Sequence, residues 1–301
     1  MTLTELRYIV ALAQEGNFSR AAERCAVSQP TLSVAIARLE SELGLPLFER
    51  GKGFVAPSDV GARVIEQALV VLREADKVGQ IALSGKDQLR GALRLGVIHT
   101  IGPYLLPQLI RALRTDAPEM PLMIEENMTA NLAAMLQNGA VDVAIIALPF
   151  EVPGVLTRAL YDEAFKVVVP QGHPWSARCE VPPEEVAGEG VLLLKAGNCF
   201  REQVLDACPH ISSADTDLRQ GHSIGTIRCM VASGLGVSVL PESALGHPYS
   251  NDMICVVPFA EPVPSRRVAL AWRTGFVRPK AIDALVRAMA ALDPAVYRPI
   301  A

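Results

Sequence analysis

The sequence predicts an α+β chain of several domains: a small helical head, one long helix, and a larger region in which strands and helices alternate. In residues 4–43, apolar residues recur at helical spacing in three short segments. Residues 58–84 contain no proline and are predicted to form one uninterrupted helix. From residue 92 onward, short apolar runs alternate with helical patterns, and 301 residues are enough for two or three domains.

The head is predicted to be a helix-turn-helix DNA reader. An amphipathic helix over residues 4–15 precedes a second helix over 18–25, for which Ser19 is the expected cap. Ser28 is a good N-cap for a third helix, and Pro30 fits its first turn, where the missing N–H costs nothing. Short polar side chains at the exposed N-terminus of this helix are suited to phosphates and base edges. The predicted buried face of the third helix is Leu32, Ile36, Leu39 and Leu43, and the predicted exposed residues are Gln29, Thr31, Ser33, Val34 and Arg38.

The charge of the head gives no separate support for DNA binding. Residues 1–64 carry seven basic and seven acidic residues, so the net charge of −4 comes from the rest of the chain. A nucleic-acid binder usually shows a basic face. The DNA-binding prediction therefore rests on the geometry of the motif.

The helix predicted over residues 58–84 would be about 40 Å long at about 1.5 Å per residue. Val64, Ala68, Leu72, Ala75 and Leu83 lie on one side of it, and neighbouring apolar residues widen the stripe. A stripe that broad on a protruding helix usually meets a partner, and the alternative is a core helix of one domain. Residues 85–91, which begin Gly-Lys-Asp-Gln, are predicted to form a polar hinge.

The remaining residues are predicted to form parallel sheets with helices on both faces, because strands and helices alternate. A span of about 210 residues favours two lobes over one sheet. Helices are expected at 104–115 and 130–138. Strands are expected at 93–97, 122–125, 141–147, 156–161, 166–169, 190–194, 237–240, 253–257 and 268–272.

Residues 195–210 contain two cysteines in a segment suited to change shape. Cys199 and Cys208 flank a predicted helix that Asn198 would cap and Pro209 would end. At the helix N-terminus, Cys199 would lie at the positive end of the dipole with Arg201 nearby, which favours a thiolate. Nine helical residues separate the two Cα atoms by roughly 13–14 Å, whereas a disulfide needs roughly 4.4–6.8 Å. The pair can be helical or bridged, as a redox switch requires; the alternative is two unrelated buried cysteines.

The head resembles the LysR-type transcriptional regulators. The resemblance is carried by Phe18-Ser19-x-Ala21-Ala22, Ser28-Gln29-Pro30-Thr31-x-Ser33 and Ile36-x-x-Leu39-Glu40-x-x-Leu43-Gly44-x-x-Leu47-Phe48-x-Arg50. It implies a winged helix-turn-helix over residues 1–57, with Arg50 and Lys52 in the wing, and a linker helix over 58–84 that pairs two subunits. After the hinge, it implies a two-lobed α/β periplasmic-binding-protein-like effector domain over 92–301. Lobe I would hold 92–162 and 267–301, and lobe II 163–266; the run from Ala232 to Pro241 matches the helix-turn-strand of the family.

Within that family, the segment Gly197-x-Cys199-Phe200-Arg201 resembles the peroxide-sensing OxyR branch. The resemblance implies that Cys199 reacts with peroxide and that Cys208 resolves the product as a disulfide. It implies a peroxide pocket formed by Thr100, Thr129, Asn198 and Arg266, with Arg201 as a further candidate. Relatives often carry His where this chain has Asn198. Asn can orient peroxide by hydrogen bonds but cannot take up its proton near neutral pH.

Three functions follow as hypotheses. The first is a hydrogen-peroxide-sensing activator of oxidative-stress genes, a dimer of dimers that binds promoter DNA and RNA polymerase without a cofactor or metal. The second is a LysR-type regulator that answers a small metabolite between the lobes. The third is a thiol peroxidase, against which the DNA reader argues. No apolar run is long enough for a membrane span and no signal peptide is evident, so a bacterial cytoplasmic location is expected.

The other four cysteines are expected to have no redox role. Cys25 is predicted to lie in the core of the head, and Cys229 and Cys255 are predicted to pack inside a helix and a strand. Cys179 is expected in a surface loop. The spacing of Cys208, His210 and His222 is too loose for a predicted metal site.

Overall fold

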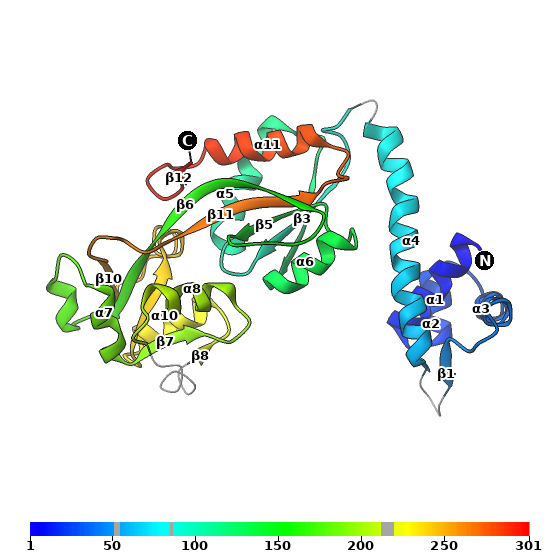
Figure 1. Cartoon of the computed structure of the whole chain (residues 1–301), viewed down its shortest axis with the longest axis horizontal. Helices are drawn as coiled ribbons and strands as arrows, with labels where there is room; N and C mark the ends of the chain where they lie inside the picture. Colours follow the sequence, from blue (N-terminus) through cyan, green and yellow to red (C-terminus); the bar gives the residue numbers. More distant parts are fainter. Residues whose placement is uncertain (51–54, 85–86, 212–219, 301) are drawn as a thin grey trace. The chain divides into compact units, whose positions relative to one another are not determined.

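A computed structural model describes residues 1–50, 55–84, 87–211 and 220–300. The chain divides into two compact units (Figure 1): the first holds Met1–Lys86, and the second holds nearly all of the chain from Asp87 to Ala301. Among the described residues, no helix is both long and apolar enough to cross a lipid bilayer.

The head of the first unit contains the three predicted helices, α1 (Leu3–Glu15), α2 (Phe18–Arg24) and α3 (Gln29–Leu43). Ser28 caps α3 as predicted, since its Oγ accepts from the backbone N–H of Thr31 at 3.3 Å. Two details of the prediction are wrong. Asn17, not Ser19, caps α2, because its Oδ1 accepts from the N–H of Ser19 at 2.9 Å. Leu43 is 37% exposed because α3 ends there and Gly44 turns the chain away.

The wing of the head is an antiparallel pair, β1 (Phe48–Arg50) and β2 (Val55–Pro57). Arg50 pairs in register with Val55. The predicted phosphate contact at Lys52 falls, together with Gly51 and Gly53, outside the described residues.

The predicted long helix is α4 (Asp59–Ser84), 26 residues that span about 39 Å. Ile65 and Ala68 are buried in the core of the head. Farther along, Val71 is 36% and Val78 69% exposed. The apolar stripe therefore begins against the head and continues onto an exposed surface; the side chain of Leu83 lies outside the description.

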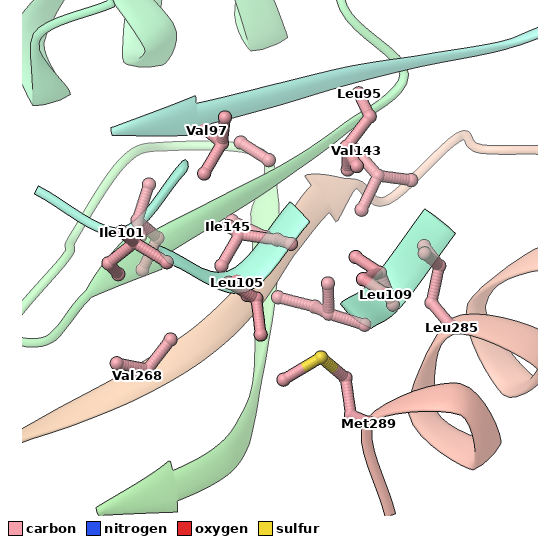
Figure 2. Close-up of a cluster of buried hydrophobic side chains, with 14 of the residues drawn as sticks. Leu95, Val97, Ile101, Leu105, Leu109, Val143, Ile145, Val268, Leu285 and Met289 are labelled. Atoms are coloured by element: carbon pink, nitrogen blue, oxygen red, sulfur yellow. The ribbon is translucent and has the colours of Figure 1, made fainter. Parts of the chain in front are cut away.

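Lobe I of the second unit has a sheet in the order β4-β3-β5-β11-β6. β3 (Leu93–Ile98) pairs in parallel with β4 (Leu122–Asn127) and β5 (Val143–Ala147). The helices of this lobe are α5 (Gly102–Asp116), α6 (Thr129–Gln137) and α11 (Pro279–Ala290). Figure 2 shows how Leu105 and Leu109 of α5 meet Leu285 and Met289 of α11 over the sheet. The sequence analysis did not identify α11.

Lobe II has a separate apolar core and a sheet in the order β10-β6-β9-β7-β8. Trp175, Phe165 and Phe200 are among its largest buried side chains. The strands are β7 (Val191–Leu194), β8 (Gln220–Gly221), β9 (Val237–Pro241) and β10 (Ile254–Pro258). The helices are α7 (Pro183–Val186), α8 (Cys199–Ala207) and α10 (Ile224–Ala232), with the short 3-10 turns η1 (Pro174–Ala177), η2 (Ala187–Glu189) and η3 (Glu242–Ala244).

Two long antiparallel strands join the lobes, β6 (Val155–Pro170) and β11 (Ser265–Arg273), which run side by side in Figure 1. The short strand β12 (Arg298–Pro299) also pairs with β6. The prediction of two strands at 156–161 and 166–169 is wrong, because Asp162 and Glu163 pair across to β11 and continue the strand. The prediction of purely parallel sheets is also wrong. The chain leaves lobe I through β6 and returns through β11, so both sheets contain antiparallel pairs.

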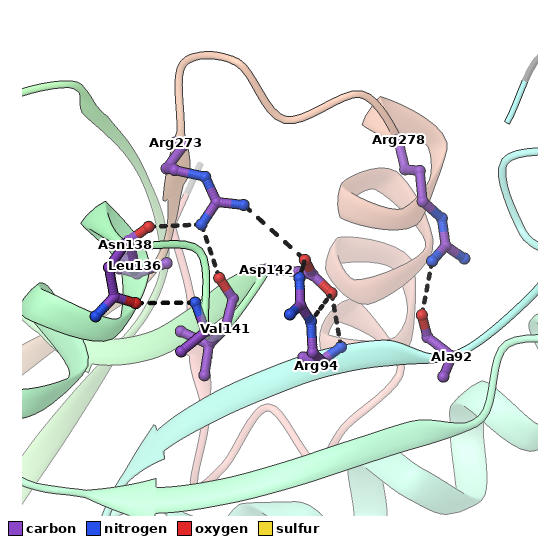
Figure 3. Close-up of polar contacts among 9 residues, drawn as sticks. Ala92, Arg94, Leu136, Asn138, Val141, Asp142, Arg273 and Arg278 are labelled. Carbon is purple, nitrogen blue, oxygen red and sulfur yellow. Dashed lines mark hydrogen bonds and ion pairs between the residues drawn. The ribbon is translucent and has the colours of Figure 1, made fainter. Parts of the chain in front are cut away.

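Buried and half-buried polar groups fix the edge of lobe I next to the predicted hinge (Figure 3). Arg94 donates to the Asp142 carboxylate through its backbone N–H at 2.9 Å and through Nη2 at 2.7 Å. The guanidinium of Arg278 donates to the carbonyls of Gln88, Gly91 and Ala92. Arg278 thus attaches the segment that enters lobe I to the start of α11.

Candidate functional site

The predicted DNA-contacting residues of α3 lie mainly on its surface. Gln29, Pro30 and Thr31 are exposed in the first turn, and Ser33 is half-buried. The Ser28 hydroxyl lies 2.8 Å from that of Thr31, so the two are hydrogen-bonded with either oxygen able to donate, and Ser28 Oγ also accepts the backbone N–H of Thr31. Val34 is 68% exposed, and the Arg38 side chain is 72% exposed with Nε 3.7 Å from Glu5. The helix therefore presents uncharged hydrogen-bonding groups and one methyl surface at its N-terminal end.

In the second unit, Cys199 and Cys208 lie at opposite ends of α8. Cys199 is the first residue of the helix and Cys208 is its C-cap. Nine helical residues separate their Cα atoms by roughly 13–14 Å. All six cysteines, each of them a described residue, are free thiols.

The environments of the two thiols differ. Cys199 is half-buried and packs against the core of lobe I, although α8 belongs to lobe II. Cys208 is 0% exposed in the core of lobe II. Burial, aided by the nearby carboxylate of Glu184, raises the pKa of the Cys208 thiol to about 11. Cys208 is therefore a protonated thiol at neutral pH, whereas Cys199 is the more accessible of the two and lies against lobe I.

Helix α8 is attached to both lobes. Phe200, 1% exposed, packs edge-on against Phe165 in the core of lobe II. The buried guanidinium of Arg201 donates through Nη1 to the Leu194 carbonyl at 3.0 Å. Gln203 lies one turn beyond Cys199, and its Nε2 donates to the Leu148 carbonyl of lobe I at 3.2 Å. Arg201 thus anchors α8 to β7, and Gln203 connects the helix to the opposite lobe.

Thr100 and Arg266 form a buried cluster next to this helix. The Arg266 guanidinium donates through Nη1 to Thr100 Oγ1 and through Nη2 to the Thr100 carbonyl, both at 2.9 Å. Its Nε donates to Glu163 Oε2 at 2.7 Å. The guanidinium carbon of Arg266 also lies 5.1 Å from the centre of the Phe200 ring. Phe200 is the residue that directly follows Cys199 in the chain. These contacts link the lobe I loop of Thr100 to the first turn of α8.

Met128, which directly precedes α6 and its first residue Thr129, lies near the start of α8. The left-handed backbone of Gly197 (φ 91°) brings that glycine close to Met128, since a Cβ at Gly197 would lie 3.5 Å from the methionine sulfur. Among the described residues, Thr129 Oγ1 and Gln203 Oε1 are buried without a hydrogen-bond partner. Asn198 is the N-cap residue of α8, but its side chain accepts no hydrogen bond from the backbone N–H groups of the first helical turn, all of which the structure describes. Unpaired buried polar atoms are costly, so these groups are suited to a small hydroxylic ligand.

Sequence reasoning missed Glu163, Gln203 and Ser243 at this site. Glu163 is one of two consecutive carboxylates, and the sequence gave no signal for which of them is buried. Gln203 follows Cys199 by four residues, so helical periodicity would have placed it on the same face. Ser243 contributes only its backbone N–H, which donates to Glu163 Oε1 at 3.1 Å, and no side-chain pattern reveals such a contact.

The remaining cysteines differ partly from expectation. Cys179 is exposed, as predicted, and Cys25 packs half-buried against the core of the head. The prediction that Cys229 is packed inside is wrong, because it lies on the solvent side of α10. Cys255 is half-buried, and its Sγ donates to Gln171 Oε1 at 2.9 Å. Within the described ranges, no three His, Cys, Asp or Glu side chains are grouped closely enough to hold a metal ion.

Comparisons with known families define the class of protein. Residues 3–62 match the bacterial regulatory helix-turn-helix of the lysR family, and residues 86–293 match the LysR substrate binding domain. The chain belongs to the LysR family of bacterial regulators.

Individual relatives within the family are more specific. The chain is 38% identical over 275 residues to the hydrogen peroxide-inducible genes activator of Pectobacterium carotovorum, covering 91% of each protein. It is 51% identical to a full-length OxyR of Pseudomonas aeruginosa that carries a cysteine-to-aspartate substitution; the match covers 99% of this chain and 97% of that one with a TM-score of 0.79. It is 31% identical to a hydrogen-peroxide-bound cysteine-to-serine mutant of Corynebacterium glutamicum OxyR, over 96% and 91% of the chains, with a TM-score of 0.66.

Proposed function

We propose that this chain is a DNA-binding transcriptional regulator that senses hydrogen peroxide and activates oxidative-stress defence genes, switched by a reversible disulfide between Cys199 and Cys208. The observation that carries the proposal is the placement of these thiols at opposite ends of α8, with Cys199 packed against the core of lobe I and Cys208 buried in the core of lobe II. The relatives support it, since the Pectobacterium protein is named for peroxide-inducible genes and the Corynebacterium structure holds hydrogen peroxide.

The chemistry begins at Cys199. Its thiolate attacks one oxygen of hydrogen peroxide, the O–O bond breaks, and the sulfur becomes a sulfenic acid while the second oxygen leaves as hydroxide. Hydroxyl groups of Thr100 and Thr129, together with Asn198, hold the peroxide by hydrogen bonds. Arg266 holds Thr100, and Arg201 holds the helix on which Cys199 lies. The hydroxide takes up a proton from solvent to give water.

Cys208 completes the switch. Its sulfur attacks the sulfenic sulfur, an S–S bond forms, the S–O bond breaks, and the released oxygen leaves as water with the proton of the Cys208 thiol. Because the intact helix separates the two Cα atoms by roughly 13–14 Å, α8 must unwind before this step. Formation of the disulfide is therefore coupled to the unwinding of α8 at the boundary between the lobes.

The switch acts on DNA through the head. In this proposal, promoter DNA meets Ser28, Gln29, Pro30, Thr31, Ser33, Val34, Arg38, Arg50 and Lys52. The exposed apolar stripe of α4 pairs two subunits, two pairs form a dimer of dimers, and RNA polymerase is the further partner.

The proposed boundaries are 1–57 for the head, 58–84 for the linker, 85–91 for the hinge and 92–301 for the sensing region, with lobe I at 92–162 and 267–301 and lobe II at 163–266. Promoter binding places the protein in the bacterial cytoplasm, where it acts as a stoichiometric switch and not as an enzyme.

A disulfide map of the full-length protein tests this proposal. The protein is treated with about one equivalent of hydrogen peroxide, alkylated, and digested with trypsin. Cleavage after Lys195, Arg201 and Arg219 separates the two thiols onto peptides 196–201 and 202–219. We expect these peptides as one cross-linked species while the other four cysteines alkylate normally. Cys208→Ser is the matched control, which should retain a sulfenic acid at Cys199 and form no cross-link.

Three results would contradict the switch. Free alkylation of Cys199 and Cys208 after peroxide treatment would leave a metabolite between the lobes as the signal. Turnover of many equivalents of peroxide in the presence of a thiol reductant would instead identify a peroxidase. Full, sustained peroxide induction of a reporter gene by Cys208→Ser would exclude the disulfide as the activating event.

A further inference from the structure

Glu163 and Arg266 form a fully buried ion pair where the two crossing strands leave lobe I. The residues lie directly opposite each other on β6 and β11. Both side chains are 0% exposed, and an Arg266 Nη2–Glu163 Oε2 contact of 2.7 Å joins them. The second carboxylate oxygen, Oε1, accepts the backbone N–H of Ser243 in η3 of lobe II at 3.1 Å. The Glu163 carboxylate therefore accepts a hydrogen bond from lobe II and also binds the Arg266 guanidinium, which contacts Thr100 of lobe I.

The contact between Arg266 and Thr100 determines the direction of the Thr100 hydroxyl proton. Arg266 Nη1 donates to Thr100 Oγ1, and a guanidinium has no acceptor to offer in return. The single hydroxyl proton of Thr100 must therefore point away from Arg266. Thr100 is buried, at 2% exposed, so this proton is directed into the protein and not into bulk water.

We propose that Glu163 is a positioning residue for the peroxide reaction, because it holds Arg266 on Thr100 and so fixes the Thr100 hydroxyl as a hydrogen-bond donor toward the peroxide. This inference rests on the proposed function and names Glu163 as a residue on which the peroxide reaction of Cys199 depends. When the Cys199 thiolate breaks the O–O bond, negative charge develops on the departing oxygen. A donor already aimed at that oxygen lowers the barrier, because no group has to reorient during the reaction.

The neutral side chain of glutamine cannot replace Glu163 in this arrangement. Both carboxylate oxygens accept hydrogen bonds, one from Arg266 and one from Ser243. Glutamine offers one acceptor oxygen, so its NH2 group must face one of the two donors. An unpaired buried guanidinium is also unfavourable. In Glu163→Gln, Arg266 therefore loses its fixed position on Thr100.

The neighbouring pair on the same strands supplies a matched control. Asp162 lies opposite Arg267, with both of its oxygens 2.8 Å from the guanidinium. The two side chains are 36% and 50% exposed on the opposite face of the strands. Asp162→Asn thus removes a cross-strand ion pair one residue away without touching Thr100.

The test compares two reagents on Cys199 in the full-length protein. Hydrogen peroxide requires a donor to the departing oxygen, whereas iodoacetamide alkylates the same thiolate and releases iodide. We expect Glu163→Gln to slow peroxide oxidation about tenfold or more, by analogy with the loss of one preorganised donor, and to change iodoacetamide alkylation less than about threefold. Asp162→Asn should leave both rates near the wild-type values. Thr100→Val should reproduce the loss, and Glu163→Gln should add nothing in the Thr100→Val background.

Several outcomes would overturn the inference. These are an unchanged peroxide rate, an equal fall with both reagents, or losses that add independently in the double variant. If Glu163→Gln does not fold, Glu163→Asp takes its place: it keeps the charge but is one methylene too short for both partners, so a selective fall of about threefold is expected, and an unchanged rate refutes the proposal. Failure of wild-type Cys199 to react with peroxide would refute the proposed function itself, which is a separate result.

Discussion

The buried thiol of Cys208 should be a poor nucleophile as long as α8 is intact. Its pKa of about 11 means that roughly one molecule in ten thousand carries the thiolate at pH 7. Relative to an ordinary cysteine with a pKa of about 8.5, the thiolate fraction is about 300-fold lower. The greater basicity of the thiolate recovers about tenfold in intrinsic reactivity. A net reduction of about 30-fold remains, before the steric effect of a side chain that is 0% exposed.

The Cys199→Ser variant isolates this property. Its alkylation by iodoacetamide is measured from pH 7 to pH 10, and peptide 202–219 reports Cys208 by mass spectrometry. Because burial raises the pKa, the rate should still increase about tenfold per pH unit at pH 9–10, where an ordinary thiol is levelling off. The same peptide from protein unfolded in guanidinium chloride should show a midpoint near about pH 8.5 and level off above about pH 9.5. A folded protein whose Cys208 matched the unfolded rate and plateau would refute the claim that α8 must open first.

Three further predictions test the surrounding structure. Thr129→Val should slow the peroxide oxidation of Cys199 about tenfold, because it removes an unpaired buried hydroxyl, and stopped-flow oxidation compared with iodoacetamide alkylation checks this; an equal change with both reagents would contradict it. Phe200→Ala should lower the free energy of unfolding of the second unit by about 3–5 kcal/mol, measured by urea denaturation, since the ring is 1% exposed; a loss below 1 kcal/mol would mean that the ring is not an anchor. Arg38→Ala should weaken DNA binding similarly on operator and random sequences and reduce the salt slope by about one, measured by fluorescence anisotropy, whereas a purely operator-specific loss would indicate a base contact instead.

The sequence was sufficient for the parts of the fold that repeat a local pattern. Helices α1, α3 and α4 each show apolar residues at helical spacing, and the Ser28 cap and the Gly44 turn mark the ends of α3. Helix α8 was predicted from only three apolar positions at helical spacing, Phe200, Val204 and Leu205, with Asn198 as the cap and Pro209 as the stop. In these segments the local propensity agrees with the tertiary structure, so the pattern alone locates the element.

Long-range pairing was beyond the reach of the sequence. The sequence predicted two strands, at 156–161 and 166–169, which left Asp162 and Glu163 outside both. In the structure, Asp162 faces outward to Arg267 and Glu163 faces inward to Arg266, partners more than one hundred residues away in the chain. Only the register between β6 and β11 decides which carboxylate is buried. The same limit explains why Glu163 was absent from the predicted site although its partner Arg266 was included.

The arrangement of α8 indicates which end of the helix moves when the disulfide forms. The N-terminal end is fixed by several independent contacts: Phe200 is buried between Phe165 and the Arg266 guanidinium, and Arg201 donates to β7. The C-terminal end depends on the apolar burial of Val204 and Cys208, and the helix already ends at Ala207. If the proposed disulfide forms, unwinding from the C-terminal end would break fewer side-chain polar contacts, so we expect Cys208 to move toward Cys199. In the proposed switch, Cys199 would then keep its position in both steps, and Cys208 would provide the change of fold.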